Sequence, residues 1–207
     1  MMPDVTLWLD DPRMQAAFVF LVAYGIGSIP FGLVLTHWAG LGDIRAIGSG
    51  NIGATNVLRT GKKSLAIATL LLDGLKGTVA VVLLRALHLE AWDLVAVVAA
   101  FLGHVFPIWL RFRGGKGVAT LVGLAGLLYW PSAVAFIAIW LGTAYIFRYS
   151  SLSALVASMA LPPLFYALSS GSEALVFAFL VALLWFRHST NIARLWAGTE
   201  SKIGDKG

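Results

Sequence analysis

The chain has 207 residues, of which 59% are hydrophobic and only 12% are charged, and it contains no cysteine. A soluble globular domain carries about 25% charged residues, so this composition excludes a soluble protein and indicates an integral membrane protein. The lack of cysteine excludes disulfides, thiolate metal sites and cysteine nucleophiles. The length allows several membrane spans but no sizeable soluble domain, so we expect residues 1–207 to form one membrane domain.

Apolar segments follow one another along the chain with short polar interruptions. The first fifteen residues carry three aspartates and one arginine, the reverse of the basic start of a cleavable signal peptide. At ~1.5 Å per helical residue, the first apolar segment is long enough to cross a bilayer. The predicted spans cover residues 16–38, 64–87, 93–110, 118–147, 152–168 and 173–186.

The segment 118–147 has two interpretations, because Trp130-Pro131-Ser132 interrupts it. It forms either one long kinked span or two short spans joined by a tight turn. Two spans bring the total to seven and place 12 of the 15 cations on one side, the side expected to be cytoplasmic. One kinked span would move Arg148 and residues 187–195 to the other side. We therefore predict an all-α membrane protein with about seven short transmembrane helices, its N-terminus outside and its C-terminus cytoplasmic.

Three polar blocks interrupt the apolar segments on that same predicted side, at residues 49–59, 111–120 and 187–195. The second block, RFRGGKGVAT, combines three cations with three glycines. Glycine lets successive backbone N–H groups turn toward one anion, and Lys116 adds a point charge. This pattern predicts a phosphate-binding loop at a membrane surface.

Other phosphate and metal signatures do not fit the chain. Lys116 is followed by Gly117 rather than by serine or threonine, so the second block is not a nucleotide-binding P-loop. No histidine pair has zinc spacing, and the carboxylates near the polar blocks are too few to hold magnesium. We expect no metal and no cofactor.

Asp73 and Lys76 lie in the middle of one predicted span, and His104 lies inside another. Asp73 and Lys76 stand three residues apart on one helix face, where they can compensate each other, so we interpret them as a structural ion pair facing the interior rather than as catalytic groups. His104 precedes the glycine-rich block by ten residues, and we expect it to brace that loop rather than to contact substrate.

The three polar blocks, taken together, closely resemble the motifs of the bacterial acyl-phosphate:glycerol-3-phosphate acyltransferases. The resemblance extends over nearly the whole chain and includes the GTESKIG sequence near the C-terminus. It rests on residues 49–59, on Gly103-His104 with Pro107 and Gly114-Gly115-Lys116-Gly117, and on Arg187-His188-Ser189-Thr190-Asn191-Ile192 followed by Arg194-Leu195. It implies transfer of an acyl group from acyl phosphate to glycerol 3-phosphate, which gives lysophosphatidic acid in the bacterial inner membrane.

This chemistry suits the residues of the blocks. Acyl phosphate is a mixed anhydride whose phosphate leaves readily, so the main task is to hold two anionic phosphates together and to aim the glycerol hydroxyl at the carbonyl. We predict catalytic roles for Ser49, Lys116, His188 and Asn191. We predict substrate or phosphate binding by Asn51, Thr55, Asn56, Arg59, Gly114, Gly115, Gly117 and Ser151. Serine, threonine and asparagine also cap helices and form turns, which is the alternative role for each of them.

Two questions of mechanism stay open at this stage. His188 is the only plausible general base among the side chains of the three blocks, but a substrate phosphate could take the proton instead and leave His188 to orient glycerol 3-phosphate. Ser151 either bonds substrate or joins two helices. Direct transfer without an acyl-enzyme is expected, because no serine lies in a nucleophile elbow.

The expected partners are acyl phosphate, glycerol 3-phosphate and membrane lipid, with no nucleic acid and no obligate protein partner. A membrane transporter of phosphorylated solutes is the alternative, although no internal repeat supports it. His88 and Asp93 have the His-x4-Asp spacing of many glycerolipid acyltransferases. We interpret that spacing as coincidence, because the pair is predicted on the side of the membrane opposite the polar blocks.

Overall fold

The computed structural model describes residues 11–204, and every regular element in this range is a helix. The expectation about an acidic N-terminus falls largely on residues 1–10, which lie outside the described range. The α-helices are α2 Pro12–Gly27, α3 Phe31–Trp38, α4 Ala54–Leu58, α5 Lys63–Arg85, α6 Asp93–Val105, α7 Val118–Leu128, α8 Trp130–Phe147, α9 Ser150–Ser158, α10 Leu161–Leu168, α11 Gly171–Arg187 and α12 Ser189–Trp196. Short 3-10 turns η1 Ile44–Ala46, η2 Glu90–Trp92 and η3 Ile108–Leu110 lie between them.

The structure confirms an all-helical protein with several membrane-spanning segments. Five segments of the described chain are long and apolar enough to cross a bilayer, and α11 and α12 add a sixth if the two helices, bent by 59°, form one span. The ambiguous stretch does divide into two helices at Trp130, with α7 as a shorter apolar helix and α8 as a full-length one. Side assignment and the full count of seven stay predictions.

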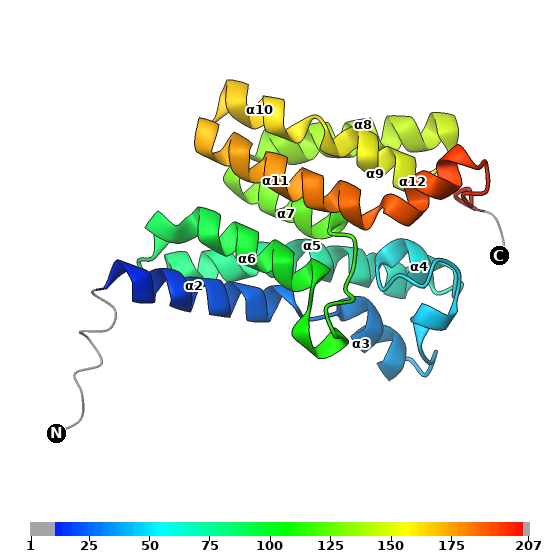
Figure 1. Cartoon of the computed structure of the whole chain (residues 1–207). Helices are drawn as coiled ribbons and strands as arrows, with labels where there is room; N and C mark the ends of the chain where they lie inside the picture. Colours follow the sequence, from blue (N-terminus) through cyan, green and yellow to red (C-terminus); the bar gives the residue numbers. More distant parts are fainter. Residues whose placement is uncertain (1–10, 205–207) are drawn as a thin grey trace.

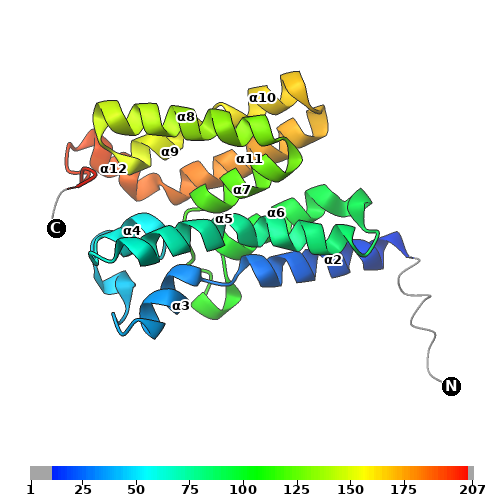
Figure 2. The same cartoon turned by 180° about the vertical axis from the view of Figure 1, so that it is seen from behind.

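The helices form two layers, which Figures 1 and 2 show from opposite sides. One layer contains α2, α5 and α6, with α3 and α4 at one end, and the other contains α7 to α12. Contacts of α7 with α5 and of α11 with α6 join the layers. The first described helix starts at one end of the molecule, and the described residues after α12 lie at the other end (Figure 1).

Close helix packing holds each layer together, because lipid removes most of the hydrophobic driving force between spans. A Cβ atom on Gly27 of α2 would lie 2.1 Å from the carbonyl oxygen of Ala100 in α6. A Cβ on Gly123 of α7 would lie 1.9 Å from the carbonyl oxygen of Gly74 in α5. Only glycine permits these backbone approaches, so α2 lies directly on α6 and α7 directly on α5.

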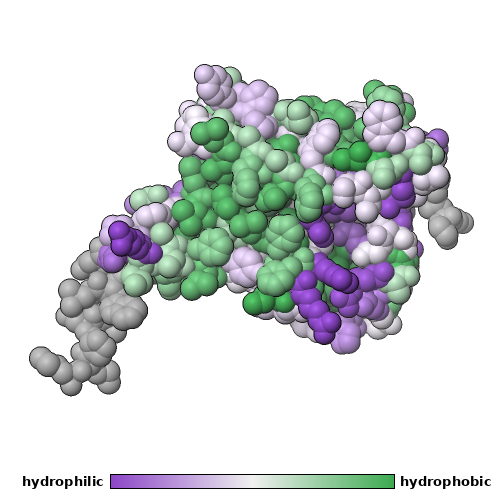
Figure 3. Space-filling view, in the orientation of Figure 1, coloured by the Kyte–Doolittle hydropathy of each residue, from purple (hydrophilic) through white to green (hydrophobic). Residues whose placement is uncertain are grey.

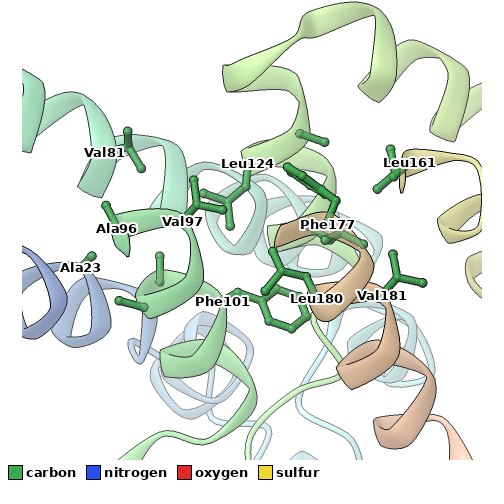
Figure 4. Close-up of a cluster of buried hydrophobic side chains, with 14 of the residues drawn as sticks. Ala23, Val81, Ala96, Val97, Phe101, Leu124, Leu161, Phe177, Leu180 and Val181 are labelled. Carbon is green, nitrogen blue, oxygen red and sulfur yellow. The ribbon is translucent and has the colours of Figure 1, made fainter. Parts of the chain in front are cut away.

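Large apolar side chains fill the space between the two layers. Phe101 of α6, Leu124 of α7 and Leu180 of α11 are fully buried and converge in one cluster (Figure 4). Many other large apolar side chains are exposed. Figure 3 shows a broad hydrophobic face over the middle of the molecule, whereas hydrophilic side chains gather at the end that holds α3 and α4. The molecule therefore has an apolar body and one strongly polar end.

A buried ion pair lies at the break between α2 and α3. Lys76 Nζ is 2.8 Å from Asp73 Oδ1, and both side chains are at most 4% exposed. Lys76 also donates to the carbonyl oxygen of Ile29 at 2.8 Å, and the Asp73 carboxylate accepts from the N–H of Phe31. Pro30 interrupts the helical ladder here, so the pair bonds backbone groups at a break that lies among apolar helices. This geometry supports the interpretation of a structural pair facing the interior.

Replacing Lys76 by methionine would leave the Asp73 carboxylate buried without its cation. We expect K76M to lower the free energy of unfolding by about 3–5 kcal/mol, and the double variant D73L/K76M to lose less, because it leaves no unpaired charge. The thermal unfolding midpoint in one detergent measures both effects. The exposed Lys62→Met is the matched control and should change stability by about 0.5 kcal/mol or less. A double variant less stable than K76M would contradict this account.

Candidate functional site

A cavity of about 630 Å³ opens where the three polar blocks converge at the polar end of the molecule. Residues 201–204 also line it, so segments far apart in the chain meet there. Of the predicted site residues, those that line the cavity are Ser49, Asn51, Thr55, Asn56, Arg59, Lys116, Gly117, Ser151, His188 and Asn191. Gly114 and Gly115 are not among the residues that line it. Within the described part of the chain, no group of three or more His, Asp or Glu side chains is placed to hold a metal ion.

The first polar block forms a loop organised around the buried amide of Asn56. Its Oδ1 accepts from the N–H of Ser49 at 3.1 Å, and its Nδ2 donates to the carbonyl oxygens of Ile44 at 2.8 Å and Asn51 at 2.7 Å. The amide is therefore occupied by the loop itself. Asn56 shapes the loop that presents Ser49 and Asn51 to the cavity, and its direct contact with phosphate stays a prediction.

The glycine-rich loop differs from the sequence-based expectation. The N–H groups of Gly114 and Gly115 donate to the carbonyl oxygens of Val105 and His104 at 3.1 and 3.0 Å. Arg187 donates to the carbonyl oxygen of Gly114 at 2.9 Å and, more weakly, to that of Gly115 at 3.4 Å. Both glycines are thus bonded within the protein on two sides, so their N–H groups are not free for phosphate. The expectation that they cradle an anion is corrected: they anchor the loop between α6 and α11.

The start of α7 has a geometry that could accommodate an anion. Gly117 has φ +88°, and a Cβ atom there would lie 2.4 Å from the ring of Phe101, so only glycine fits. Val118 and Ala119 follow Gly117 in the cavity wall. The first N–H groups of a helix have no partner within it and carry partial positive charge. Together with the ammonium group of Lys116, this helix start can bind a phosphate.

Glu200, which sequence reasoning did not assign, joins the third block to the rest of the site. Its Oε1 accepts from Asn191 Nδ2 at 2.6 Å and from Ser151 Oγ at 2.7 Å, and its Oε2 accepts from Arg194 Nε at 2.6 Å. Lys116 Nζ in turn donates to Asn191 Oδ1. The available signal was that Glu200 is the one carboxylate in residues 187–204, among several cations.

The segment after α12 closes one side of the cavity. Arg59 of the first block donates to Ser201 Oγ. The N–H of Ile203 donates to the carbonyl oxygen of Arg148 at 2.6 Å, and Arg148 Nη2 donates to the carbonyl oxygen of Ile203 at 3.1 Å. These bonds fasten the segment to the first block and to the end of α8. The resemblance of GTESKIG to the family's C-terminal sequence therefore falls on a wall of the cavity.

His188 stands at the bend between α11 and α12 and is 2% exposed. Its Nδ1 lies 2.8 Å from the carbonyl oxygen of Leu184. A carbonyl only accepts, so Nδ1 carries the proton and Nε2 is the acceptor in the neutral ring. Burial lowers the pKa of His188 to about 4, and the nearby Lys116 cation adds to this effect. The ring is therefore neutral and able to accept a proton or a hydrogen bond.

The electrostatics of the cavity favour dianions. Burial lowers the pKa of Lys116 to about 8, although the Glu200 carboxylate opposes this effect. Burial alone would raise the pKa of Glu200, but its hydrogen bonds from Ser151, Asn191 and Arg194 outweigh burial and lower it. Arg59 and Lys63 also line the cavity. On this side of the cavity, the positive charges of Lys116, Arg59 and Lys63 outnumber the single carboxylate of Glu200. A phosphate that enters would reduce the repulsion among these cations.

One side of the cavity is apolar and reaches the lipid-facing surface. Leu58, Leu70, Trp140 and Ala154 contribute to its lining, and Leu70 on α5 is 50% exposed. A polar region lined by cations therefore adjoins a hydrophobic wall that extends along α5, α8 and α9. This arrangement fits a ligand with a phosphate head and a hydrocarbon chain.

Comparison with known proteins gives a consistent set of similarities. A family profile described as glycerol-3-phosphate acyltransferase matches residues 17–198. Curated proteins with that name are 56% identical in Nitrobacter winogradskyi (94% of this chain, 98% of the relative) and 58% identical in Methylorubrum extorquens (95% and 96%). Crystal structures of the integral membrane glycerol 3-phosphate acyltransferase PlsY are also similar. The glycerol 3-phosphate form has a TM-score of 0.83 at 34% identity (91% of this chain, 96% of that one), and the lysophosphatidic acid form has 0.82 at 33% identity (91% and 95%).

Proposed function

The chain belongs to the glycerol-3-phosphate acyltransferase family, and we propose that it transfers a fatty acyl group from acyl phosphate to the sn-1 hydroxyl of glycerol 3-phosphate. The products are lysophosphatidic acid and phosphate. The observation that carries this proposal is the cavity in which cations and a helix start adjoin an apolar wall. The similar structures in glycerol 3-phosphate and lysophosphatidic acid forms support the acceptor and the product. They favour this enzyme over a transporter of phosphorylated solutes.

The cavity can offset the repulsion between two phosphorylated substrates. Arg59 and Lys63 come from one layer, Lys116 and the start of α7 from the other. In a partly buried site these groups stabilise phosphate more strongly than in water. We assign to Ser49, Asn51 and Thr55 the role of neutral donors to phosphate or carbonyl oxygens. Asn191 accepts a hydrogen bond from Lys116, and both Asn191 and Ser151 donate to Glu200. These bonds hold Lys116 in place.

The acyl transfer itself is direct. The C1 hydroxyl oxygen of glycerol 3-phosphate attacks the acyl carbonyl carbon, the bond from that carbon to the phosphate oxygen breaks, and phosphate leaves with the electron pair. His188 Nε2 takes the hydroxyl proton, because its Nδ1 is already bonded to the Leu184 carbonyl and the ring lines the cavity. Two bound phosphates would raise the low pKa of His188 toward the value a base needs. The donor phosphate is the rival proton acceptor.

The apolar wall defines the path of the acyl chain. Leu58 and Leu70 are about half exposed at the edge of the cavity, so a lipid-soluble donor can enter sideways between α5 and the other layer. Glycerol 3-phosphate would arrive from the aqueous side at the polar end. The cation bias toward this end supports a cytoplasmic site in the bacterial inner membrane.

The central test offers the purified protein three donors with glycerol 3-phosphate: acyl phosphate, acyl coenzyme A and acyl carrier protein. We expect lysophosphatidic acid from acyl phosphate alone, with phosphate release that requires glycerol 3-phosphate. The assay in detergent excludes transport as a cause. Phosphate release without the acceptor would indicate hydrolysis, and product from either thioester alone would contradict the assigned donor.

The pKa of Lys116 gives a pH dependence. Because this pKa is lowered to about 8, the free enzyme loses a phosphate-binding charge as pH rises through that value. We expect kcat/KM for glycerol 3-phosphate to fall about tenfold per unit above pH ~8. The substrate phosphate is already dianionic there, since its second pKa is about 6. In K116R the charge persists, so the decline should move to higher pH. Lys62→Arg is the control, and identical alkaline limbs in K116R and wild type would refute the assignment.

Replacement of His188 by glutamine separates a base from a hydrogen-bonding residue. Glutamine can still bond substrate but cannot take a proton, so we expect kcat to fall by about 10²–10⁴-fold with little change in KM. Single-turnover kinetics with acyl phosphate measure this change. The exposed His37→Gln serves as the matched control. Retention of most of the rate would instead make the donor phosphate the base.

A further inference from the structure

A second histidine, His104, also lines the cavity, although it belongs to none of the three polar blocks. His104 lies near the end of α6, is 5% exposed and lines the cavity. Its ring packs over Gly115: a Cβ atom on that glycine would lie 2.2 Å from His104 Nε2. The ring therefore takes the space that a side chain at position 115 would need, and it is His104 itself, not Gly115, that lines the cavity. Gly115 also precedes Lys116, so the ring lies beside the phosphate-binding end of the cavity.

The surroundings of His104 assign its two ring nitrogens. Nδ1 is fully buried, has no hydrogen-bond partner among residues 11–204, and lies 3.8 Å from Asp73 Oδ1. The other charged groups nearby are Lys76 of α5, which is bonded to Asp73, and Arg187 of α11, which is bonded to the glycine loop. In a neutral imidazole one nitrogen donates and the other accepts, and a carboxylate beside Nδ1 favours the proton there. Nε2, on the side of Gly115, is then an acceptor.

The charged groups on the cation-rich side of this cavity are donors. The ammonium and guanidinium groups of Lys116, Arg59 and Lys63 and the start of α7 all donate, which suits phosphate. The carboxylate of Glu200 already accepts three hydrogen bonds. A glycerol hydroxyl must donate to something, and glycerol 3-phosphate has two hydroxyls. The two neutral imidazoles, His188 and His104, each offer one ring nitrogen as an acceptor, beside the hydroxyl and amide oxygens of Ser49, Asn51 and Thr55.

We propose that His104 Nε2 accepts a hydrogen bond from the C2 hydroxyl of glycerol 3-phosphate, so that this ring makes the enzyme selective for a 2-hydroxylated acceptor. The inference rests on the proposed function and deepens it. The Asp73 carboxylate, 3.8 Å from Nδ1 and not hydrogen-bonded to it, favours the proton on that nitrogen electrostatically. His188 attends to the reacting C1 hydroxyl, and His104 holds the neighbouring hydroxyl so that C1 faces the acyl carbonyl.

The test compares glycerol 3-phosphate with 3-hydroxypropyl phosphate, which keeps the phosphate and the primary hydroxyl but lacks the C2 hydroxyl. We expect the wild-type chain to prefer glycerol 3-phosphate by about 10- to 100-fold in kcat/KM, since the analogue leaves a buried acceptor unpaired. His104→Phe should lower kcat/KM for glycerol 3-phosphate, leave it nearly unchanged for the analogue, and bring the ratio close to one. His104→Gln, whose amide oxygen can reach the position of Nε2, should restore part of the preference. His37→Phe is the matched control.

The ratio of kcat/KM for glycerol 3-phosphate to kcat/KM for 3-hydroxypropyl phosphate distinguishes recognition of the C2 hydroxyl from mere support of the glycine-rich loop. If His104 only braced Gly115, His104→Phe would reduce both reactions by the same factor, and that result would overturn the inference. Equal use of both acceptors by the wild-type chain would overturn it as well, without any variant. If His104→Phe does not fold, His104→Gln decides: an equal reduction of both reactions, with the full wild-type preference kept, would overturn the inference. Lack of transfer to either acceptor by the wild-type chain would instead overturn the proposed function.

Discussion

The carboxylate of Glu200 is the interaction on which the arrangement of the site depends. It accepts hydrogen bonds from Ser151 of α9 and from Asn191 and Arg194 of α12, and Asn191 in turn accepts from Lys116. One partly buried charge thus joins its own segment to α9 and α12 and, through Asn191, to the cation expected to bind phosphate. Without a carboxylate here, burial of several cations at one end of the molecule would be unfavourable, because like charges in a low dielectric repel strongly.

The same principle operates deeper in the bundle. In a bilayer, broken helices persist only where the freed backbone groups find partners inside the protein. The Asp73–Lys76 pair bonds backbone groups of Ile29 and Phe31 at the break between α2 and α3. It lies directly beside His104 and therefore beneath the glycine-rich loop. Asp73 thus belongs both to the buried ion pair and to the lining of the cavity. This double position gives a reason for a costly charge pair within an apolar span.

Sequence reasoning was most accurate where chemistry follows from residue type. The all-helical membrane architecture, the division at Trp130, the meeting of the three blocks and the paired state of Asp73 and Lys76 agree with the structure. Sequence reasoning was wrong where a backbone N–H group could bond either a ligand or another part of the protein. The glycine N–H groups bond the end of α6 rather than face the cavity. Glu200 escaped notice because a carboxylate in a basic terminal segment has no distinctive pattern along the chain.

The sequence by itself determined that this is a polytopic membrane protein with three polar, cation-bearing blocks and indicated its family, because hydrophobic length, cation placement and motif order are all properties of the chain. Only the tertiary structure decided which donors and acceptors remain free. Hydrogen-bond partners come from distant segments: Arg187 reaches Gly114 across 73 positions, and Arg59 reaches Ser201 across 142. Those pairings depend on how helices pack in three dimensions, where a shift of one helical turn exchanges one partner for another, and local sequence carries no record of that choice.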